Sequence, residues 1–306
     1  MNKKDGILLG VSGGCDSITM LDLFLKIKDE MNISLGIAHL NHGLRGKKAD
    51  HDEKYVADLA EKNDLAFYNK KVDVKALAKE QALSLEDAAR RARYDFFKTI
   101  CTKQKLNKIA LAHTQDDQTE TILLNISRGT GLSGLTGMPQ RRKLTDSIEI
   151  VRPLLDFTKA DLQKYCKANK LTWREDHTNN DLDLSRNRIR KEIIPKLKKL
   201  NPNLNSTFQK MSEVVAKEDE YLEKKAEEIF PSLVQKQVNN GIRLDTGSLL
   251  KHPLSLQRRV VRKALEQVQG HLTDVYLPYI ENFLNNCLTT IKLDSKGKLH
   301  VSKERL

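Results

Sequence analysis

Cysteine is scarce in this sequence, and the few cysteines are scattered along it. The four of them form no C-x-x-C pair: Cys15, Cys101, Cys166 and Cys287. This spacing argues against a disulfide framework and against a zinc site, and it suits a reducing compartment. Long apolar stretches are also missing, since no run reaches the roughly 18 residues that a membrane helix needs. The charged N-terminus has no signal-peptide core. We therefore expect a cytoplasmic protein without a membrane partner.

A Walker A loop, G-x-x-x-x-G-K-[ST], is absent, which argues against a P-loop nucleotide hydrolase. Negative charge is in deficit, because the net charge is +12 and the pI is near 9.4. Such a balance favours a polyanionic partner through long-range attraction. Many basic proteins bind no nucleic acid, so charge alone leaves the partner open. With 39% hydrophobic and 31% charged residues, the chain has enough apolar material for a folded core.

Short apolar strands alternate with helical segments over the first two-thirds of the chain. Strands are predicted at 6–11, 33–38, 65–68 and 108–112, and helices at 18–27, 49–61, 85–101 and 118–127. This alternation predicts an α/β fold in which a parallel sheet carries helices on both faces. Ligands of such sheets bind at the carboxyl ends of the strands. A further strand at 148–155 and helices at 159–168 and 188–200 follow, the last with a break at Pro195.

The length of 306 residues suits one large and one smaller domain. Asn201-Pro202-Asn203 is a plausible boundary because it breaks regular structure. We predict a catalytic domain over residues 1–203. Residues 204–306 would then form a long charged linker helix and a smaller, mainly helical domain.

A glycine-containing loop lies between the first strand and the first helix: Ser12-Gly13-Gly14-Cys15-Asp16-Ser17. Glycines let backbone N–H groups approach phosphate oxygens, and the helix N-terminus adds positive potential. The hydroxyls of Ser12 and Ser17 can donate hydrogen bonds. Asp16 would repel phosphate unless it holds Mg²⁺ or a cationic substrate. The plain alternative is a tight turn between a strand and a helix.

The ends of two later strands carry further polar groups. The second strand ends in His39-Leu40-Asn41-His42-Gly43-Leu44-Arg45, and the fourth in His113 and then Asp116, Asp117 and Glu120. Asp117 and Glu120 are three residues apart and share a helix face, so they suit a metal or an ammonium group. Simple capping of the helix is the alternative. The two histidines lack a third ligand, which disfavours a metal site there.

Two arginine-rich segments and one glycine pattern complete the candidates. Arg90 and Arg93 precede Tyr94, and Arg186, Arg190 and Lys191 belong to the densest basic stretch. Each segment is either a solvated helix face or a surface that contacts phosphates. The G-x-G-x-x-G at 129–134 follows a helix rather than a strand, so we reject a dinucleotide site there and predict a flexible loop.

Together these segments resemble the tRNA(Ile)-lysidine synthetase family, whose members carry a PP-loop of the N-type ATP pyrophosphatases. The loop alone would name only the superfamily with its adenine nucleotide alpha hydrolase-like fold. The specific motifs span residues 6–203 in the family's order: 12–17, 39–45, 86–94, 116–121, 128–138, 152–155, 173–176, 179–181 and 186–187. Many relatives have a second histidine where Thr114 stands, and long relatives have a further C-terminal domain that we expect this chain to lack. We expect either a natural short form or a shortened chain.

The resemblance implies a reaction. ATP adenylates C2 of the wobble cytidine (position 34) of tRNA(Ile) with a CAU anticodon, and free L-lysine then displaces AMP. The product, lysidine, changes codon recognition from AUG to AUA. ATP and Mg²⁺ are implied, as are tRNA(Ile) and lysine as partners, with a monomer or homodimer as the oligomeric state.

The resemblance also implies roles for individual residues. Catalysis would involve Asp16, Asp117, Glu120 and Arg186, with Asp16 serving Mg²⁺. Asp117 and Glu120 would bind lysine. ATP would contact Ser12, Gly13, Gly14, Cys15, Asp16, Ser17, His39 and His113, and tRNA would contact Arg90, Arg93, Arg186, Arg190 and Lys191.

Three alternatives stay open. A tRNA thiolase of the same superfamily would need reactive cysteines or an iron–sulfur set. An amide-forming synthetase would need an ammonia source, and no glutaminase-like segment is present. A non-catalytic basic RNA-binding protein would not need the intact polar set Ser12, Asp16, Asp117 and Glu120.

Overall fold

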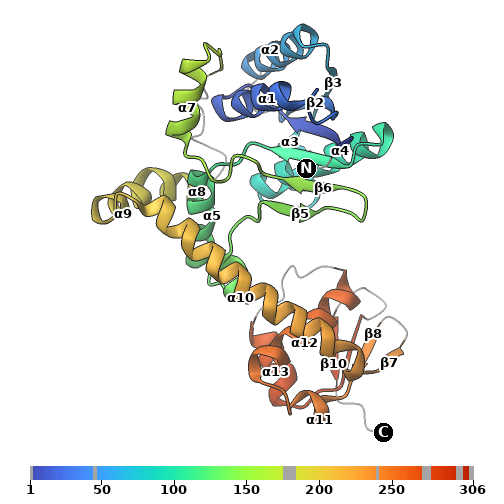
Figure 1. Ribbon diagram of the computed structural model, residues 1–306. Helices are drawn as coiled ribbons and strands as arrows, with labels where there is room; N and C mark the ends of the chain where they lie inside the picture. The colour runs from blue at the N-terminus through green and yellow to red at the C-terminus, as the bar shows by residue number, and fades with distance from the viewer. Residues whose placement is uncertain are drawn as a thin grey trace. The chain divides into compact units, whose positions relative to one another are not determined.

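The computed structural model describes residues 3–43, 47–174, 184–238, 241–270, 277–293 and 299–302 (Figure 1). The motif residues Leu44 and Arg45, and those at 175–176 and 179–181, lie outside the described residues. The chain divides into two compact units, residues 1–213 and 214–306, and each unit is described by itself. No helix in the described ranges is long and apolar enough to cross a bilayer.

The first unit is built on a six-stranded sheet with the order β3-β2-β1-β4-β6-β5. The strands are β1 (Gly6–Gly10), β2 (Ser34–Asn41), β3 (Ala66–Lys71), β4 (Lys108–Leu111), β5 (Arg141–Lys143) and β6 (Glu149–Val151). All neighbours pair in parallel except the edge strand β5, which runs antiparallel to β6. The predicted strands therefore form, and β5 is the one that was not foreseen.

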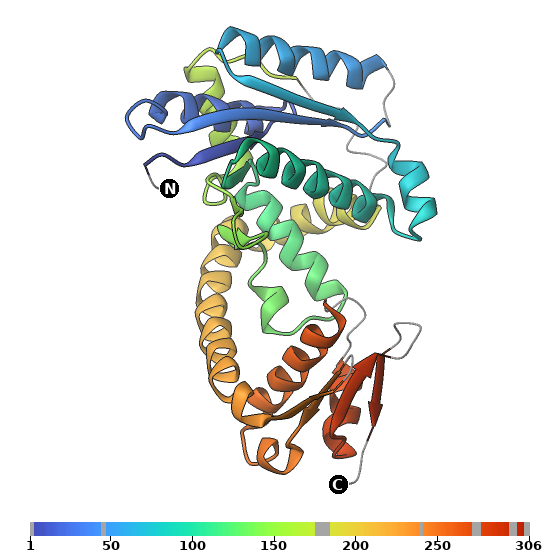
Figure 2. The same cartoon turned by 90° about the vertical axis from the view of Figure 1, so that its right-hand side faces the viewer.

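Helices cover both faces of this sheet, as the alternation of strands and helices predicts (Figures 1 and 2). On one face, α1 (Cys15–Ile27), α2 (Lys47–Lys62) and α7 (Lys159–Ala168) pack against Ile7 and Leu9 of β1. On the other face, α4 (Leu85–Gln104) packs against Leu8. Successive residues of β1 thus point to opposite faces and are buried on both, which is why the strand is apolar throughout.

The rest of the first unit is helical and supports the edge where the strands end. It contains α3 (Val74–Glu80), α5 (Gln115–Ser127), α6 (Leu132–Leu135), α8 (Leu184–Arg188), the π-helical turn η1 (Ile189–Ile193), α9 (Ile194–Leu200) and the start of α10 (Leu204–Leu233). Leu124 of α5 packs with Ile189, Ile194 and Leu204. The irregularity predicted at Pro195 is a change from π-helix to α-helix just before it, and the proline occupies the first turn of α9.

The second unit holds the predicted helices and also a sheet. The helices are the rest of α10, α11 (Thr246–Leu249), α12 (Leu254–Gln269) and α13 (Leu277–Asn285). They pack on an antiparallel sheet, β10-β9-β8-β7, formed by β7 (Val234–Val238), β8 (Gly241–Leu244), β9 (Thr290–Leu293) and β10 (Leu299–Ser302). The sequence analysis did not predict this sheet, whose strands have four or five residues each.

Candidate active site

A cavity of about 210 Å³ opens where β1, β2 and β4 end. Its lining comes from the loop after β1, from His39 and His42 of the second strand's end, from His113 after β4, and from Arg93 and Phe97 of α4. Pockets for whole small-molecule ligands usually measure about 300–1,000 Å³. This cavity is smaller, so it has room for only a part of such a ligand.

The loop after β1 has the backbone that a phosphate site needs. Gly13 has φ +92, a left-handed conformation that favours glycine. The N–H groups of Ser12 and Gly13 donate to the Ser17 hydroxyl oxygen at 3.2 and 3.1 Å, and this hydroxyl donates to the Gly14 carbonyl oxygen at 2.9 Å. Gly14 caps α1 with no side-chain hydrogen bond, so the first N–H groups of the helix are left for an anion.

Asp16 is the acidic residue of this loop and lines the cavity. Burial raises its pKa to about 6, and the charges of Asp117 and Asp116 act in the same direction while Lys159 opposes them. Its charged form is therefore disfavoured unless a cation comes close. A carboxylate in this state, beside a loop built for phosphate, fits a Mg²⁺ shared with phosphate oxygens, because Mg²⁺ is usually held by one or two carboxylates plus substrate phosphates.

His39 and His113, two of the histidines that line the cavity, have different surroundings. The His39 ring is buried, with Nδ1 2.9 Å from the carbonyl oxygen of Val11, to which it can donate. Burial lowers the pKa of His113 to about 3. The charges of Arg93 and Arg152 lower this pKa further, whereas the charge of Asp117 opposes the change. Arg152 Nε donates to His113 Nδ1 at 3.1 Å, so the other ring nitrogen carries the proton. His113 is therefore a neutral donor rather than a proton-transfer group at pH 7.

Asp117 uses its two carboxylate oxygens for different purposes. Oδ2 accepts from the Thr114 N–H at 2.9 Å and from the Thr114 hydroxyl at 2.8 Å, which makes a capping box. Oδ1 faces the ammonium of Lys159 at 3.2 Å. Burial would raise the pKa of Asp117, but Lys159, His113 and the Thr114 hydrogen bonds together lower it. Thr114 is thus the helix cap.

Glu120 lies on the same helix face and is 2% exposed. Arg190 holds it in a bidentate pair, with Nε 2.6 Å from Oε1 and Nη2 2.8 Å from Oε2. Arg186 Nε lies 3.5 Å from Oε2, and its terminal nitrogens donate to Glu86 and Thr121. Arg186 and Arg190 were expected to contact RNA, but both are bound to carboxylates of this site. Lys191, in the same basic stretch, is exposed.

Asp116 makes contacts that the sequence analysis did not predict. The Lys159 backbone N–H donates to Asp116 Oδ2 at 2.9 Å, and Asn205 Nδ2 donates to Asp116 Oδ1 at 2.8 Å. Asp116 thereby joins α5 to α7 and α10 and places the Lys159 ammonium beside Asp117. Capping was the only role that the sequence suggested for Asp116, and the partner residues, 43 and 89 positions away, carry no signal in their own motifs.

Cys15 has a thiol neighbour that is distant in the sequence. Its Sγ lies 3.5 Å from Sγ of Cys166 on α7, and both are free thiols. Burial raises the pKa of Cys15 to about 12, and the adjacent Cys166 adds to this rise. Nucleophilic cysteines have lowered pKa values, so the loop cysteine is a poor nucleophile.

Known proteins are similar in sequence to the region around the loop and also to the whole length of the chain. Residues 1–197 match the PP-loop domain family. The tRNA(Ile)-lysidine synthase of Clostridium tetani is 35% identical over 100% of this chain and 63% of its own length. That of Clostridium acetobutylicum is 38% identical over 87% of this chain and 56% of its own length. The chain thus spans about three-fifths of the length of these relatives.

Among solved structures, the fold is similar to that of the U34-tRNA thiolase NcsA from Methanococcus maripaludis with its [4Fe-4S] cluster. The TM-score is 0.58 and the sequence identity 17%, and the match covers 70% of this chain and 72% of that one. At this identity the likeness concerns the fold alone.

Proposed function

The chain belongs to the PP-loop domain family, and from that premise we propose that it is an ATP-dependent tRNA(Ile)-lysidine synthase. The 35% identity over the full chain to a protein of that name carries the proposal. The reaction joins free L-lysine to C2 of the wobble cytidine of a tRNA(Ile) with a CAU anticodon. We place it in the cytoplasm, as a monomer or homodimer.

In the first step, the C2 oxygen of cytosine attacks the α-phosphorus of ATP, and pyrophosphate leaves. The N–H groups at the uncapped start of α1 would stabilise charge on the phosphates, since preorganised N–H donors act strongly where negative charge develops. The neutral His113 lines the cavity beside the loop, as does His39. Asp16 would hold Mg²⁺, which supplies electrostatic stabilisation of the leaving group when bound.

In the second step, the ε-amine of lysine attacks C2, AMP leaves and the amine loses a proton. Asp117 Oδ1 already faces one ammonium, that of Lys159, so it is the oxygen best suited to the ammonium of free lysine. Both oxygens of Glu120 are bound to Arg190. Glu120 would therefore affect lysine binding indirectly, by holding Arg190 and Arg186 in place. It would contact lysine directly only after Arg190 moves away.

A tRNA thiolase is the main enzymatic alternative, and the positions of the cysteines disfavour it. Cys15 and Cys166 lie together, Cys101 of α4 is buried against the sheet, and Cys287 belongs to the second unit. Within the described residues, no three His, Cys, Asp or Glu side chains are grouped to hold a metal. The raised pKa of Cys15 further disfavours sulfur chemistry at this loop.

The products of ATP test the proposed function directly. We expect AMP and pyrophosphate to form together with tRNA modification, and the modified tRNA to gain the mass of a lysyl group. A loop of this type cleaves between the α and β phosphates, whereas a Walker-type loop would give ADP and phosphate. Chromatography of labelled ATP together with mass analysis of the tRNA makes the measurement. ADP released in proportion to modification, or a gain of sulfur mass, contradicts the proposal.

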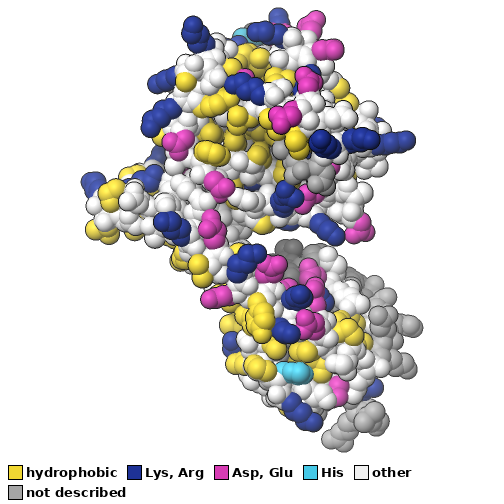
Figure 3. All heavy atoms as spheres, viewed as in Figure 1, with side chains coloured by type: hydrophobic (Ala, Val, Ile, Leu, Met, Phe, Trp, Pro, Cys, Tyr) yellow, Lys and Arg dark blue, Asp and Glu magenta, His cyan; other side chains and the backbone are white. Residues whose placement is uncertain are grey.

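We further propose that the second unit contributes to tRNA binding. On the face shown in Figure 3, Lys and Arg side chains are interspersed with Asp and Glu in both units. On α12, Arg258, Arg259 and Lys263 are paired with carboxylates, whereas Arg262 is exposed. Only cations that are free to neutralise phosphates add to the salt dependence. Each neutralised phosphate lowers the logarithm of the binding constant by about 0.7–0.9 per tenfold rise in salt concentration.

A chain ended after Glu213 is expected to bind ATP normally and tRNA at least about tenfold more weakly, with a shallower salt dependence. The cut keeps Asn205 and Gln209, which contact α5, and it keeps the whole loop after β1. Filter binding at several salt concentrations, with a circular dichroism spectrum as folding control, measures the effect. A folded short chain that binds tRNA as tightly as the full chain refutes this division of labour.

A further inference from the structure

Four arginines converge on one tyrosine beside the cavity. The guanidinium carbons of Arg90, Arg93 and Arg142 lie 5.2, 6.0 and 5.5 Å from the centre of the Tyr94 ring. Arg152, the fourth, is close enough for its charge to act on the Tyr94 hydroxyl. Arg90 and Arg93 come from α4, Arg142 from β5, and Arg152 directly follows β6. Three elements that are distant in the sequence thus bring positive charge to one place, named here the arginine cluster.

The arginine cluster has no carboxylate partner within the part of the chain that the structure describes. Arg152 donates to neutral acceptors, His113 Nδ1 and the Pro139 carbonyl oxygen. Arg93 Nε is buried without a hydrogen-bond partner in that same part. Glu86, whose charge acts on Arg93, is held by Arg186 at 2.8 Å. By contrast, Arg190, Arg186 and Arg259 all have carboxylate partners.

The electrostatics of the arginine cluster call for an anion. Burial lowers the pKa of Arg93 and also that of Arg152, which means that their charged forms are poorly solvated. Burial would raise the pKa of Tyr94, yet the four arginines lower it. A phosphate would relieve both the mutual repulsion and the poor solvation, because guanidinium groups bind phosphate oxygens through paired N–H donors.

We propose that the arginine cluster binds backbone phosphate of the RNA substrate, next to the nucleotide that reacts in the cavity; this rests on the proposed function. Arg93 lines the cavity itself, whereas Arg142 is exposed on the edge strand β5. The cluster therefore leads from the cavity to the surface, as a polymer that enters the site would require. The phosphates of ATP have their own donors in the loop after β1. Arg142 and Arg152, for which no role was predicted, join the predicted Arg90 and Arg93.

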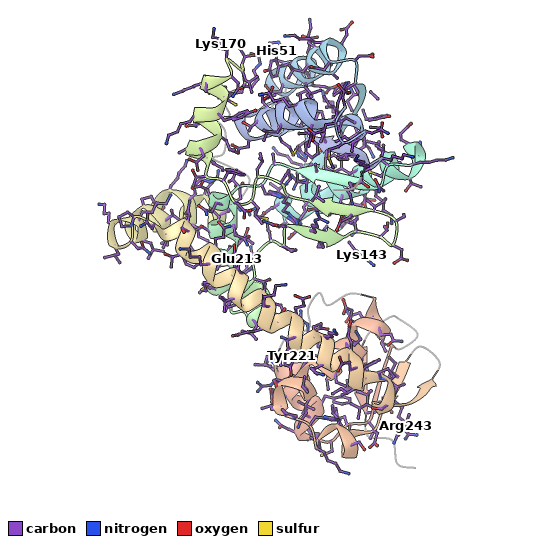
Figure 4. The ribbon with its side chains drawn as sticks, in the orientation of Figure 1. His51, Lys143, Lys170, Glu213, Tyr221 and Arg243 are labelled. Atoms are coloured by element: carbon purple, nitrogen blue, oxygen red, sulfur yellow. The ribbon has the colours of Figure 1, made fainter. Side chains whose placement is uncertain are left out.

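The edge strand β5 offers a matched pair of variants for the test. Arg141 and Arg142 are adjacent and both exposed, and neighbouring side chains of a strand point to opposite faces. Only Arg142 lies over Tyr94; the strand ends at Lys143, labelled in Figure 4. Arg142→Ala and Arg141→Ala remove the same charge, so any general effect of net charge is common to both.

Arg142→Ala is expected to weaken tRNA binding about tenfold and to reduce the salt slope by about 0.7–0.9, the share of one phosphate contact. Arg141→Ala should change affinity less than about twofold. Arg142→Lys should fall between Arg142→Ala and wild type, because lysine keeps the charge but not the planar fork. Binding of ATP and of inorganic pyrophosphate should be unchanged in all three variants. Thermal melting confirms that each variant is folded.

Equal weakening by Arg141→Ala and Arg142→Ala overturns the inference, as does tRNA binding that Arg142→Ala leaves unchanged. Weaker pyrophosphate or ATP binding with unchanged tRNA binding also overturns it, and assigns the arginine cluster to the nucleotide. If Arg142→Ala weakens tRNA binding but wild type forms no lysidine, the site stands and the proposed reaction fails. A wild-type protein that binds no tRNA refutes both.

Discussion

Asp16→Asn is expected to lower ATP-dependent adenylation of tRNA at least about a hundredfold, and at the same time to make the folded protein more heat-resistant at pH 7. The first effect follows from the place of Asp16 in the cavity, where it would hold the cation that balances the phosphates. The second follows from burial, which makes its charge unfavourable in the absence of ligand. Loss of activity with gain of stability is the mark of a residue kept for function.

The gain in stability should depend on pH in a defined direction. The pKa of Asp16 is about 6 in the folded chain, above the ordinary value of 3.8 for an aspartate side chain. Above pH 6 the folded protein carries the unfavourable charge, and below about pH 4 the group is protonated in both the folded and unfolded states. Wild type therefore loses stability as pH rises through this window, by about 2 kcal/mol after allowance for solvent screening. The asparagine variant does not have this loss.

Melting temperatures of both proteins between pH 4 and pH 8, without ATP, measure this difference. We expect a few degrees in favour of the variant at pH 7 and little difference near pH 4. Asp58→Asn, at an exposed position on α2, is the control and should change neither melting nor activity. If the Asp16→Asn protein melts at a lower temperature than wild type at pH 7, the negative charge of Asp16 is stabilised in the folded state, contrary to this prediction.

Sequence patterns were enough to find the loop and the edge of the sheet where the cavity lies. The reason is local: a strand, a glycine turn and a helix start are encoded within residues 6–17. The carboxyl ends of parallel strands then bring His39, His113 and Asp16 to one place, whatever the details of packing.

The charge pairing inside the site could not be predicted in this way. Glu120 is bound by Arg190, 70 residues away, and Asp117 by Lys159, 42 residues away. Which cation reaches which carboxylate depends on how α7 and the turn η1 pack against α5. A basic stretch such as Arg186–Lys191 looks the same in sequence whether it faces solvent, RNA or a buried glutamate.

The second large effect concerns Asp117, where Asp117→Asn is expected to raise the lysine concentration needed for half-maximal transfer about ten- to a hundredfold. Loss of a hydrogen bond to a charged group costs about 1.5–3 kcal/mol, which corresponds to such a factor. Oδ1, which already faces one ammonium, is the oxygen whose charge would be lost to free lysine. The asparagine oxygen can still accept the two Thr114 hydrogen bonds of the cap, so the start of α5 should persist.

Glu120→Gln is expected to behave differently, because Glu120 is bound to two arginines and is almost fully buried. Removal of one partner of a buried ion pair costs about 3–5 kcal/mol. Arg190 is 30% exposed and recovers some hydration, so the lower end of this range applies. The melting temperature should fall by several degrees, and both steps of the reaction should weaken together.

Labelled ATP separates the two reaction steps: adenylation of tRNA is measured without lysine, and lysine transfer is then measured over a range of lysine concentrations. In Asp117→Asn, adenylation should stay within about threefold of wild type, while transfer shifts to higher lysine. The two steps separate because the start of α1 and Asp16, which would serve ATP, are untouched, and only the oxygen facing an ammonium is changed. Glu120→Gln, compared at a temperature where it is folded, should not separate them. If Asp117→Asn loses adenylation first and keeps its lysine dependence, Asp117 serves ATP or Mg²⁺ through the charge it shares with Asp16, and the lysine site lies elsewhere.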